Sequence, residues 1–277
     1  MRKRPWRLGP ILQGIALFLA LACGMLFFAQ DFLLFRPTRD LSGWEALCAQ
    51  PSFEAVEVVS GEKSWHGMLR RAEGDATETL ILLFLGNEQN AAPIMRYMEQ
   101  SGMWAYFGGC SCLVMDYAGY GINGGRPSAK DMCEEALAAF DYASALPGVS
   151  RVIAGGYSIG TGSAAYLAAR REVAGLFLLA PFSNSYDLYN SALPVFFGPM
   201  RLLVRHRFSS DTCAQAVRVP ALVVASRDDE VIPFASSEKL NGSLEQSTFV
   251  PLDGVDHNSI LYDRVALESI KAYLETL

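Results

Sequence analysis

Arg151–Arg170 reads R-V-I-A-G-G-Y-S-I-G-T-G-S-A-A-Y-L-A-A-R, which predicts a strand, a sharp turn and a helix in close succession. The β-branched residues at its start favour a strand, and the alanine-rich end favours a helix. Between them stands the motif G-x-S-x-G, with Ser158 between Gly156 and Gly160. The glycines let two backbone segments pass close to a strained turn, which lifts the serine hydroxyl above the edge of a sheet. The segment therefore predicts an exposed serine nucleophile in front of a helix N-terminus.

Alternating strands and helices are predicted on both sides of this segment. Thr79–Leu85 is a continuous apolar run, typical of a central parallel strand. By the same criteria we expect strands at 54–60, 64–71, 79–85, 111–116, 173–179, 221–225 and 246–251, and helices at 42–49, 91–101, 128–146, 233–240 and 259–276. This alternation predicts an α/β domain with one doubly wound, mostly parallel sheet and its active loops at the carboxyl ends of the strands.

The longest stretch without a predicted element is 182–217. A loop of this length inside a compact domain is usually a lid or a binding element. Its Phe- and Leu-rich part, Leu193–Met200, suits a cap over an acyl-binding site.

The charge of the chain argues against a nucleic-acid partner. Four of its 23 basic residues precede the first acidic residue, Asp31, so the remainder carries 19 basic against 29 acidic residues. This acidic body has no basic stripe, so nucleic-acid binding is not expected. The chain also has no cysteine spacing typical of a metal site. We expect no cofactor and no metal.

The N-terminus predicts a membrane anchor. Residues 8–29 contain no charge and would span about 33 Å as a helix, enough to cross a bilayer. A secretory signal peptide is the alternative, because Ala20-Leu21-Ala22 resembles a cleavage site and Cys23 follows it. The apolar run is longer than an ordinary signal-peptide core, which favours an uncleaved anchor. The basic residues of segment 1–7 would keep it in the cytoplasm and place the body on the other side, the periplasm in a bacterium.

A serine nucleophile needs a base to take its proton and an acid to orient that base. Among the three histidines, His257 lies in a loop between the last predicted strand and helix, whereas His66 lies in a strand and His206 in the presumed cap. The acid should follow the strand at 221–225, where we select Asp229, with Asp228 as the alternative. The resulting chain order Ser, Asp, His is the order of a known hydrolase fold.

The oxyanion that forms during acyl transfer needs two preset N–H donors. One should be the amide of Ile159, the residue after the nucleophile. The other should come from the loop after the strand that ends at Leu85, and we expect the amide of Asn87 to supply it.

With these residues in place, the chain from about Phe32 onward resembles the α/β-hydrolase superfamily, and within it the serine aminopeptidase-like branch of single-pass, membrane-anchored serine hydrolases. The resemblance rests on Leu33–Pro37, Gly86-Asn87, Asp116–Gly121, Gly156–Gly160, Asp229–Pro233 and His257-Asn258. It implies the same roles for Ser158, Asp229 and His257, and for the amides of Asn87 and Ile159. Two departures stand out, because this chain has Leu85 where the family usually has histidine and Ala118 where it usually has arginine.

The expected organisation is a basic N-terminus (1–7), a transmembrane anchor (8–29), a juxtamembrane segment (30–53) and an α/β-hydrolase domain (54–277) with a cap at about 182–217. The expected activity is cleavage of an ester or thioester with an apolar, lipid-like acyl chain through an acyl-serine intermediate. Two alternatives stay open: an amide or peptide hydrolase of the aminopeptidase type, and a catalytically idle fold that acts as a membrane-tethered binding module. An aminopeptidase would need a carboxylate for the substrate amine, with Glu88 and Asp187 as candidates.

Overall fold

The computed structural model describes residues 8–72 and 79–277, and an eight-stranded sheet forms its centre. The strand order is β1-β2-β4-β3-β5-β6-β7-β8. β2 pairs antiparallel with β1 and β4, and every other neighbouring pair is parallel. The strands are β1 Phe53–Ser60, β2 Lys63–Arg70, β3 Thr79–Phe84, β4 Ser111–Met115, β5 Arg151–Tyr157, β6 Gly175–Leu179, β7 Ala221–Ser226 and β8 Ser247–Leu252. The predicted doubly wound, mostly parallel sheet is confirmed.

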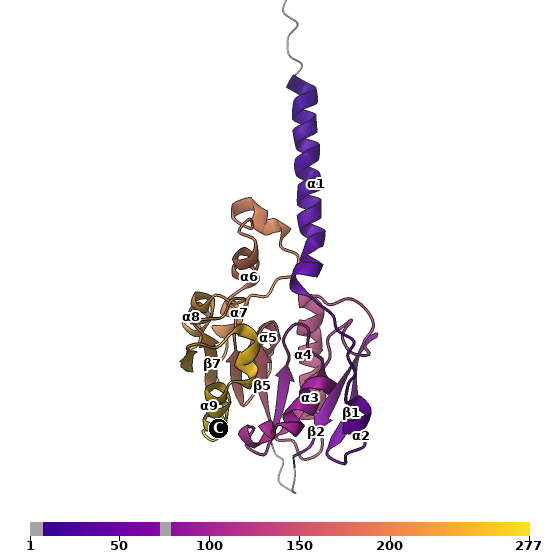
Figure 1. Ribbon diagram of the computed structural model, residues 1–277, viewed down its shortest axis with the longest axis vertical. Coiled ribbons are helices and arrows are strands. Elements are labelled where there is room, and N and C mark those ends of the chain that lie inside the picture. Colours follow the sequence, from indigo (N-terminus) through magenta and orange to yellow (C-terminus); the bar gives the residue numbers. More distant parts are fainter. Residues whose placement is uncertain (1–7, 73–78) are drawn as a thin grey trace, which may run out of the picture.

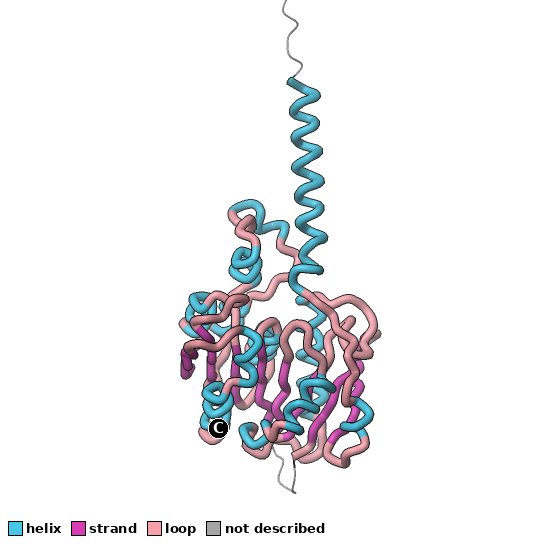
Figure 2. The backbone as a smooth tube through the Cα atoms, in the orientation of Figure 1, coloured by secondary structure: helices cyan, strands magenta, loops and turns pink. Residues whose placement is uncertain are grey.

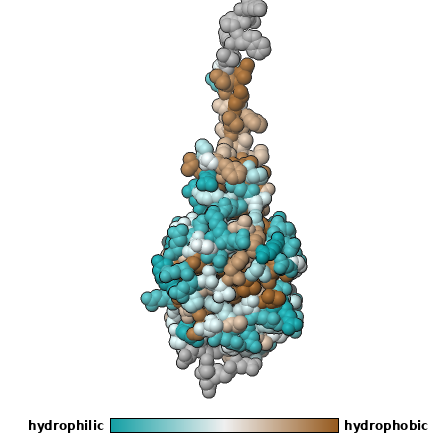
Figure 3. All heavy atoms as spheres, turned by 90° about the vertical axis from the view of Figure 1, so that its left-hand side faces the viewer, coloured by the Kyte–Doolittle hydropathy of each residue, from teal (hydrophilic) through white to brown (hydrophobic). Residues whose placement is uncertain are grey.

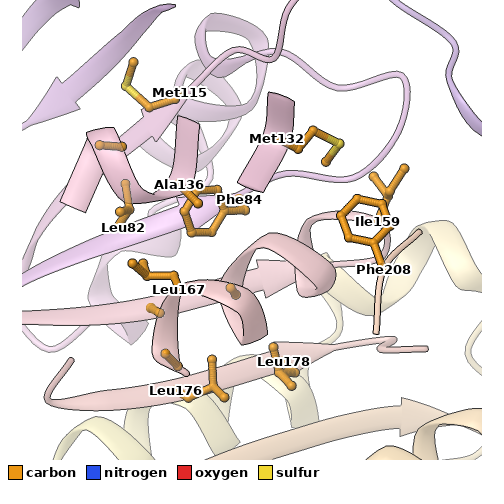
Figure 4. Packing of buried hydrophobic residues seen from close by; sticks show 14 of the residues in the cluster. Leu82, Phe84, Met115, Met132, Ala136, Ile159, Leu167, Leu176, Leu178 and Phe208 are labelled. Carbon is orange, nitrogen blue, oxygen red and sulfur yellow. The ribbon is translucent and has the colours of Figure 1, made fainter. Parts of the chain in front are cut away.

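Both faces of the sheet are buried, because helices cover each of them. In β3, Leu80, Leu82 and Phe84 join one apolar cluster while Ile81 and Leu83 join the other, as expected for side chains that alternate along a strand. Figure 4 shows the first cluster, where Leu82 and Phe84 lie among side chains of α4 and α5. The helices are α2 Trp44–Cys48, α3 Ala91–Gln100, α4 Ala129–Ser144, α5 Gly160–Ala168, α8 Phe234–Asn241 and α9 Arg264–Leu274, with a 3₁₀ turn η1 at Met103–Tyr106.

The segment 182–217 is not irregular, contrary to our expectation. It contains α6 Ser185–Ala192, the 3₁₀ turn η2 Gly198–Leu203 and α7 Ser210–Ala214. Asn184 caps α6 by accepting the N–H of Asp187 at 3.0 Å, a local signal that marks the start of a helix. We call residues 182–217 the cap.

The predicted closing helix at 259–276 is two elements. The 3₁₀ turn η3 His257–Tyr262 precedes α9, and Asp263 separates them with an extended backbone. The carboxylate of Asp263 accepts the N–H of Ala266 at 3.0 Å, so it caps α9 and ends the continuity of the helix.

The N-terminal helix α1 Leu8–Leu34 stands away from the body (Figure 1). Its part Gly9–Leu34 is long and apolar enough to cross a membrane, and a signal sequence would pass the same test. The helix runs past Ala29, the predicted end of the span, and the side chains of Leu34 and Phe35 are buried in the main core. The predicted basic N-terminus, residues 1–7, lies outside the described residues.

The cap stands beside the base of α1, and both project from the same side of the body (Figures 1 and 2). Gln30 of α1 joins them, because its side-chain amide donates to the carbonyl of Leu203 at 2.8 Å and its side-chain oxygen accepts the N–H of Arg205 at 2.8 Å. The end of the N-terminal helix is therefore part of the folded body.

Candidate active site

Ser158 occupies a strained turn between β5 and α5. Its φ angle is +51°, in the left-handed region that side chains other than glycine rarely adopt. A Cβ on Gly160 would lie 2.3 Å from the carbonyl oxygen of Phe84, and one on Gly156 would lie 2.7 Å from the Cα of Thr161. Both glycines are therefore required by close backbone packing, as the motif predicts.

The side chains of Ser158, His257 and Asp229 form one continuous chain of hydrogen bonds. His257 Nε2 lies 2.8 Å from Ser158 Oγ, and His257 Nδ1 lies 2.7 Å from Asp229 Oδ2. The rings and oxygens involved are buried, with 6% of the His257 side chain and 2% of the Asp229 side chain exposed. Such an arrangement can move a proton from the serine hydroxyl to an imidazole that a buried carboxylate orients.

The structure distinguishes Asp229 from its neighbour Asp228. Asp229 Oδ1 accepts the N–H groups of Val231 and Ile232 at 2.8 and 2.7 Å, which leaves Oδ2 to face His257. Asp228 Oδ2 instead accepts the N–H of Gly254 at 2.6 Å. Asp228 therefore supports the loop that carries His257 without contacting the imidazole.

Two further residues hold His257, and we did not predict either. The Tyr157 hydroxyl donates to the carbonyl of His257 at 2.7 Å, and the two rings stack at 5.6 Å. The N–H of His257 donates to Glu230 Oε2 at 3.1 Å. Burial raises the pKa of the Tyr157 phenol, so it stays a hydrogen-bond donor at neutral pH. The only signal in the sequence was that each residue adjoins a predicted site residue.

Asn87 and Ile159, the predicted oxyanion residues, line the same cavity as Ser158. Within residues 8–72 and 79–277, neither backbone N–H donates a hydrogen bond to the protein. Oxyanion stabilisation requires N–H groups without a protein acceptor, and the assignment of Asn87 and Ile159 to this role stays a prediction.

The loop that carries Asn87 is held by tyrosines of the Asp116–Gly121 segment. The Tyr120 hydroxyl donates to Asn87 Oδ1 at 2.6 Å, and the Tyr117 hydroxyl donates to the carbonyl of Leu85 at 2.7 Å. The N–H of Arg36 also donates to Asn87 Oδ1, at 2.8 Å. These bonds hold the loop although Leu85 replaces the histidine usual in the resembled family.

The other two histidines lie away from the serine. His66 lies in β2, and its Nδ1 is 2.9 Å from Asn123 Oδ1. His206 is buried, and its Nε2 is 2.6 Å from Asp31 Oδ1, so it joins the cap to α1. Burial lowers the pKa of His206. In the described part of the chain, no group of three or more His, Cys, Asp or Glu side chains is arranged to hold a metal ion.

Two cavities meet at Ser158. The first, of about 140 Å³, is mainly apolar and is lined by Leu33 and Leu34 of α1, Asn87, Ser158, Ile159, Leu188, Tyr189, Ser191 and Ala192 of the cap, and Val231 and Ile232. The second, of about 420 Å³, is more polar and includes Arg36, Glu88, Gln89, His257 and Asn258 among its lining residues. An apolar group and a polar group can thus be held in two adjoining cavities at the serine.

Comparison with curated proteins finds relatives that match part of the chain. An uncharacterized protein of Mycobacterium tuberculosis is 34% identical over 171 residues, which is 60% of each chain. The lysophosphatidylserine lipase ABHD12 of Macaca fascicularis is 29% identical over 154 residues, 48% of this chain and 37% of the lipase. The chain therefore spans less than two thirds of the length of these relatives. A scan against models of protein families finds no match.

Solved structures match most of the chain. Est1E from Butyrivibrio proteoclasticus with bound ferulic acid has a TM-score of 0.65 at 18% identity, covering 80% of this chain and 98% of that one. This similarity, together with the strand order, confirms that the chain has the α/β-hydrolase fold.

Proposed function

We propose, from the α/β-hydrolase fold and the hydrogen-bonded chain at Ser158, that this protein is a membrane-anchored serine hydrolase that cleaves esters or thioesters. The observation that carries the proposal is the 2.8 Å contact of His257 with Ser158 and the 2.7 Å contact of His257 with Asp229. Similarity to a lysophosphatidylserine lipase and to a structure with bound ferulic acid supports an acyl ester as substrate.

In the proposed mechanism, His257 takes the proton of Ser158 as Oγ attacks the acyl carbonyl carbon. The N–H groups of Asn87 and Ile159 stabilise the negative oxygen of the tetrahedral intermediate, and each such donor is worth roughly 3 to 4 kcal/mol of barrier. His257 then gives its proton to the leaving oxygen or sulfur, leaving an acyl group on Ser158. A water molecule, activated in turn by His257, releases the acid.

The two cavities suggest how a substrate lies. The acyl chain would enter the apolar cavity of about 140 Å³ beside Ile159. An apolar cavity of about 150 Å³ accommodates benzene, so about the first six carbons of an acyl chain, counted from the ester, would fill this one. The alcohol or thiol portion would occupy the polar cavity beside His257 and Asn258.

No observation favours the aminopeptidase alternative. Asp187, one candidate for binding a substrate amine, is engaged by Lys239 at 2.8 Å and lines neither cavity at Ser158. Glu88 lines the polar cavity but forms an ion pair with Arg36 at 3.1 Å. Each carboxylate already has a cationic partner, which argues for ester over aminopeptidase chemistry.

Membrane attachment through residues 8–29, with the N-terminus in the cytoplasm and the catalytic domain on the other side, is part of the proposal. The apolar length of α1 supports it. The intact mass of the protein purified from membranes tests whether the anchor is retained, because an uncleaved anchor keeps the full chain whereas signal cleavage removes the residues before Cys23.

Labelling of the detergent-solubilised protein with a fluorophosphonate tests the proposed nucleophile. We expect a covalent adduct on Ser158 in the parent and none in Ser158→Ala. The same variant should lose hydrolysis of p-nitrophenyl esters. A folded parent that remains unlabelled would support the binding-module alternative and contradict the proposed function.

A further inference from the structure

The part of the cap between Asp187 and Asp211 combines apolar and basic residues. Between Asp187 and Asp211 the chain has no acidic residue, whereas Arg201, Arg205 and Arg207 lie in this interval. The rest of the body is acidic, so this interval is unusual within the chain. Apolar and cationic side chains together are typical of segments that lie in a membrane interface.

Large apolar side chains at this tip point into solvent. Leu202 is 77% exposed, Phe197 is 56% exposed and Leu193 is 37% exposed. Phe32, at the base of α1, is 83% exposed. Figure 3 shows that the apolar surface of α1 continues into apolar side chains around its base. We call residues 193–202 the cap tip.

Contacts place Leu203 and Arg205, which directly follow the cap tip, at the level where α1 would leave the bilayer. Gln30 Nε2 donates to the carbonyl of Leu203, and the guanidinium of Arg205 lies 5.5 Å from the ring centre of Phe27. Asp31, the first charged residue after the apolar run, binds Arg205 at 2.8 Å. Because the uncharged run ends at this level, the residues just before Arg205 lie at the membrane surface if α1 spans the bilayer.

Of the three arginines between Asp187 and Asp211, Arg201 and Arg207 have no carboxylate partner in the described residues. Arg201 stacks over the ring of Tyr186 at 5.1 Å, and Arg207 donates to the carbonyls of Val204 and Leu202. Neither forms an ion pair with any carboxylate in the described residues. Their charges are therefore available to lipid phosphates, which attract basic residues near a bilayer.

The apolar cavity lies between these two membrane-facing elements. Leu33 and Leu34 come from the last turn of α1, and Leu188 and Ala192 come from the cap helix that leads into the cap tip. The walls of the cavity and the proposed bilayer contacts thus belong to the same pair of elements.

We propose that the cap tip docks on the bilayer beside α1, so that the apolar cavity receives the acyl chain of an ester or thioester resident in the membrane directly from the lipid phase. This inference rests on the proposed function and on α1 as a membrane anchor. It names the substrate class as a membrane-resident amphiphile, whose acyl chain reaches Ser158 between α1 and the cap.

The test uses the full chain in vesicles of phosphatidylcholine and phosphatidylglycerol mixed three to one. Two substrates are compared: the water-soluble p-nitrophenyl butyrate, and a palmitoyl ester of 4-methylumbelliferone dissolved in the bilayer. Leu202→Glu and Phe197→Glu change exposed cap-tip residues that line neither cavity. Val265→Glu on α9 is the matched control, because Val265 is 51% exposed and α9 lies away from α1 (Figure 1).

We expect each cap-tip variant to lower kcat/KM for the bilayer ester about tenfold, because glutamate replaces a large apolar side chain that would bind the membrane surface. Hydrolysis of the soluble ester should stay within about twofold of the parent, as should both activities of the control. Equal activity of the cap-tip variants and the parent on the bilayer ester would overturn the inference. So would an equal loss on both esters. If Ser158→Ala keeps the activity of the parent, the proposed function itself fails.

Fluorescence gives a readout that does not depend on catalysis. Phe197→Trp adds one tryptophan to those of the parent protein. In vesicles that contain brominated phosphatidylcholine, the emission of this added tryptophan should be quenched, since bromine quenches only indoles in contact with the bilayer. Val265→Trp serves as control and should add unquenched emission. Unquenched emission from Phe197→Trp would contradict docking.

Discussion

Replacing Asp229 by asparagine should reduce kcat about ten-thousandfold, and the hydrogen bonds of the site explain why. Asp229 Oδ1 accepts two backbone N–H groups at 2.8 and 2.7 Å, so the amide oxygen of an asparagine would take that position. Its NH₂ group would then face His257 Nδ1 in place of the carboxylate. The imidazole would have to accept at Nδ1 and carry its proton on Nε2, where it cannot take the proton of Ser158.

Two contributions set the size of this effect. Losing the buried carboxylate removes an attraction to the imidazolium of roughly 4 kcal/mol, for unit charges about 4 Å apart at an effective dielectric constant of about 20. This corresponds to about a thousandfold in rate. The wrong tautomer adds to the loss, and the same substitution in another serine hydrolase lowers kcat by about ten-thousandfold.

The assay is hydrolysis of p-nitrophenyl butyrate by detergent-solubilised protein, with Asp228→Asn as matched control. Asp228 lies one residue away and contacts Gly254 rather than His257, so its variant should lose less than tenfold. Circular dichroism of both variants checks that they are folded. A loss below tenfold in Asp229→Asn, or equal losses in the two variants, would refute the assignment of Asp229 as the residue that orients His257.

Three further predictions concern the oxyanion loop, the acyl cavity and a buried carboxyl. Tyr120→Phe removes the 2.6 Å bond to Asn87 Oδ1 and should lower kcat about five- to tenfold with KM unchanged, as measured by steady-state kinetics; an effect on KM alone would contradict a role in positioning the oxyanion loop. Leu188→Ala enlarges the apolar cavity and should move the preferred p-nitrophenyl ester to a longer acyl chain by about two carbons, whereas an unchanged preference would place the acyl chain elsewhere. Burial raises the pKa of Asp116 to about 6 from 3.8, so the folded state gains stability through this group as pH falls from 6 to 4, up to about 3 kcal/mol. The melting temperature of Asp116→Asn relative to the parent should therefore be higher at pH 7.5 than at pH 4, and the opposite order would contradict the buried charge.

The strand-turn-helix around Ser158 was predictable because its causes are local. Two glycines at fixed spacing around a serine report a backbone packed too closely for a side chain, and the contacts at Gly156 and Gly160 bear this out. The central strands were predictable for a similar reason, since a continuous apolar run needs cover on both faces. The capping residues Asn184 and Asp263 carried equally local signals, and using them would have located α6 and the start of α9.

The partners that hold the site residues could not be predicted from local pattern. Tyr157 and His257 are 100 residues apart in the chain, yet the hydroxyl of one binds the carbonyl of the other. Tyr120 reaches Asn87 over a separation of 33 residues. Nothing in the sequence near a tyrosine specifies the distant carbonyl or amide that its hydroxyl will meet.

Periodicity, glycine spacing and chain order express short-range constraints, so they are enough to predict the α/β class, the mostly parallel sheet and the loops that carry Ser158, Asp229 and His257. The folded structure is needed to show that Asp229 rather than Asp228 faces His257, because the side chains of adjacent residues point in different directions. It also decided that Leu33 of α1 lines the cavity at Ser158, and that Asp31 binds His206 across a separation of 175 residues. Contacts of that range depend on how the sheet and its helices bring distant segments together, which no local pattern encodes.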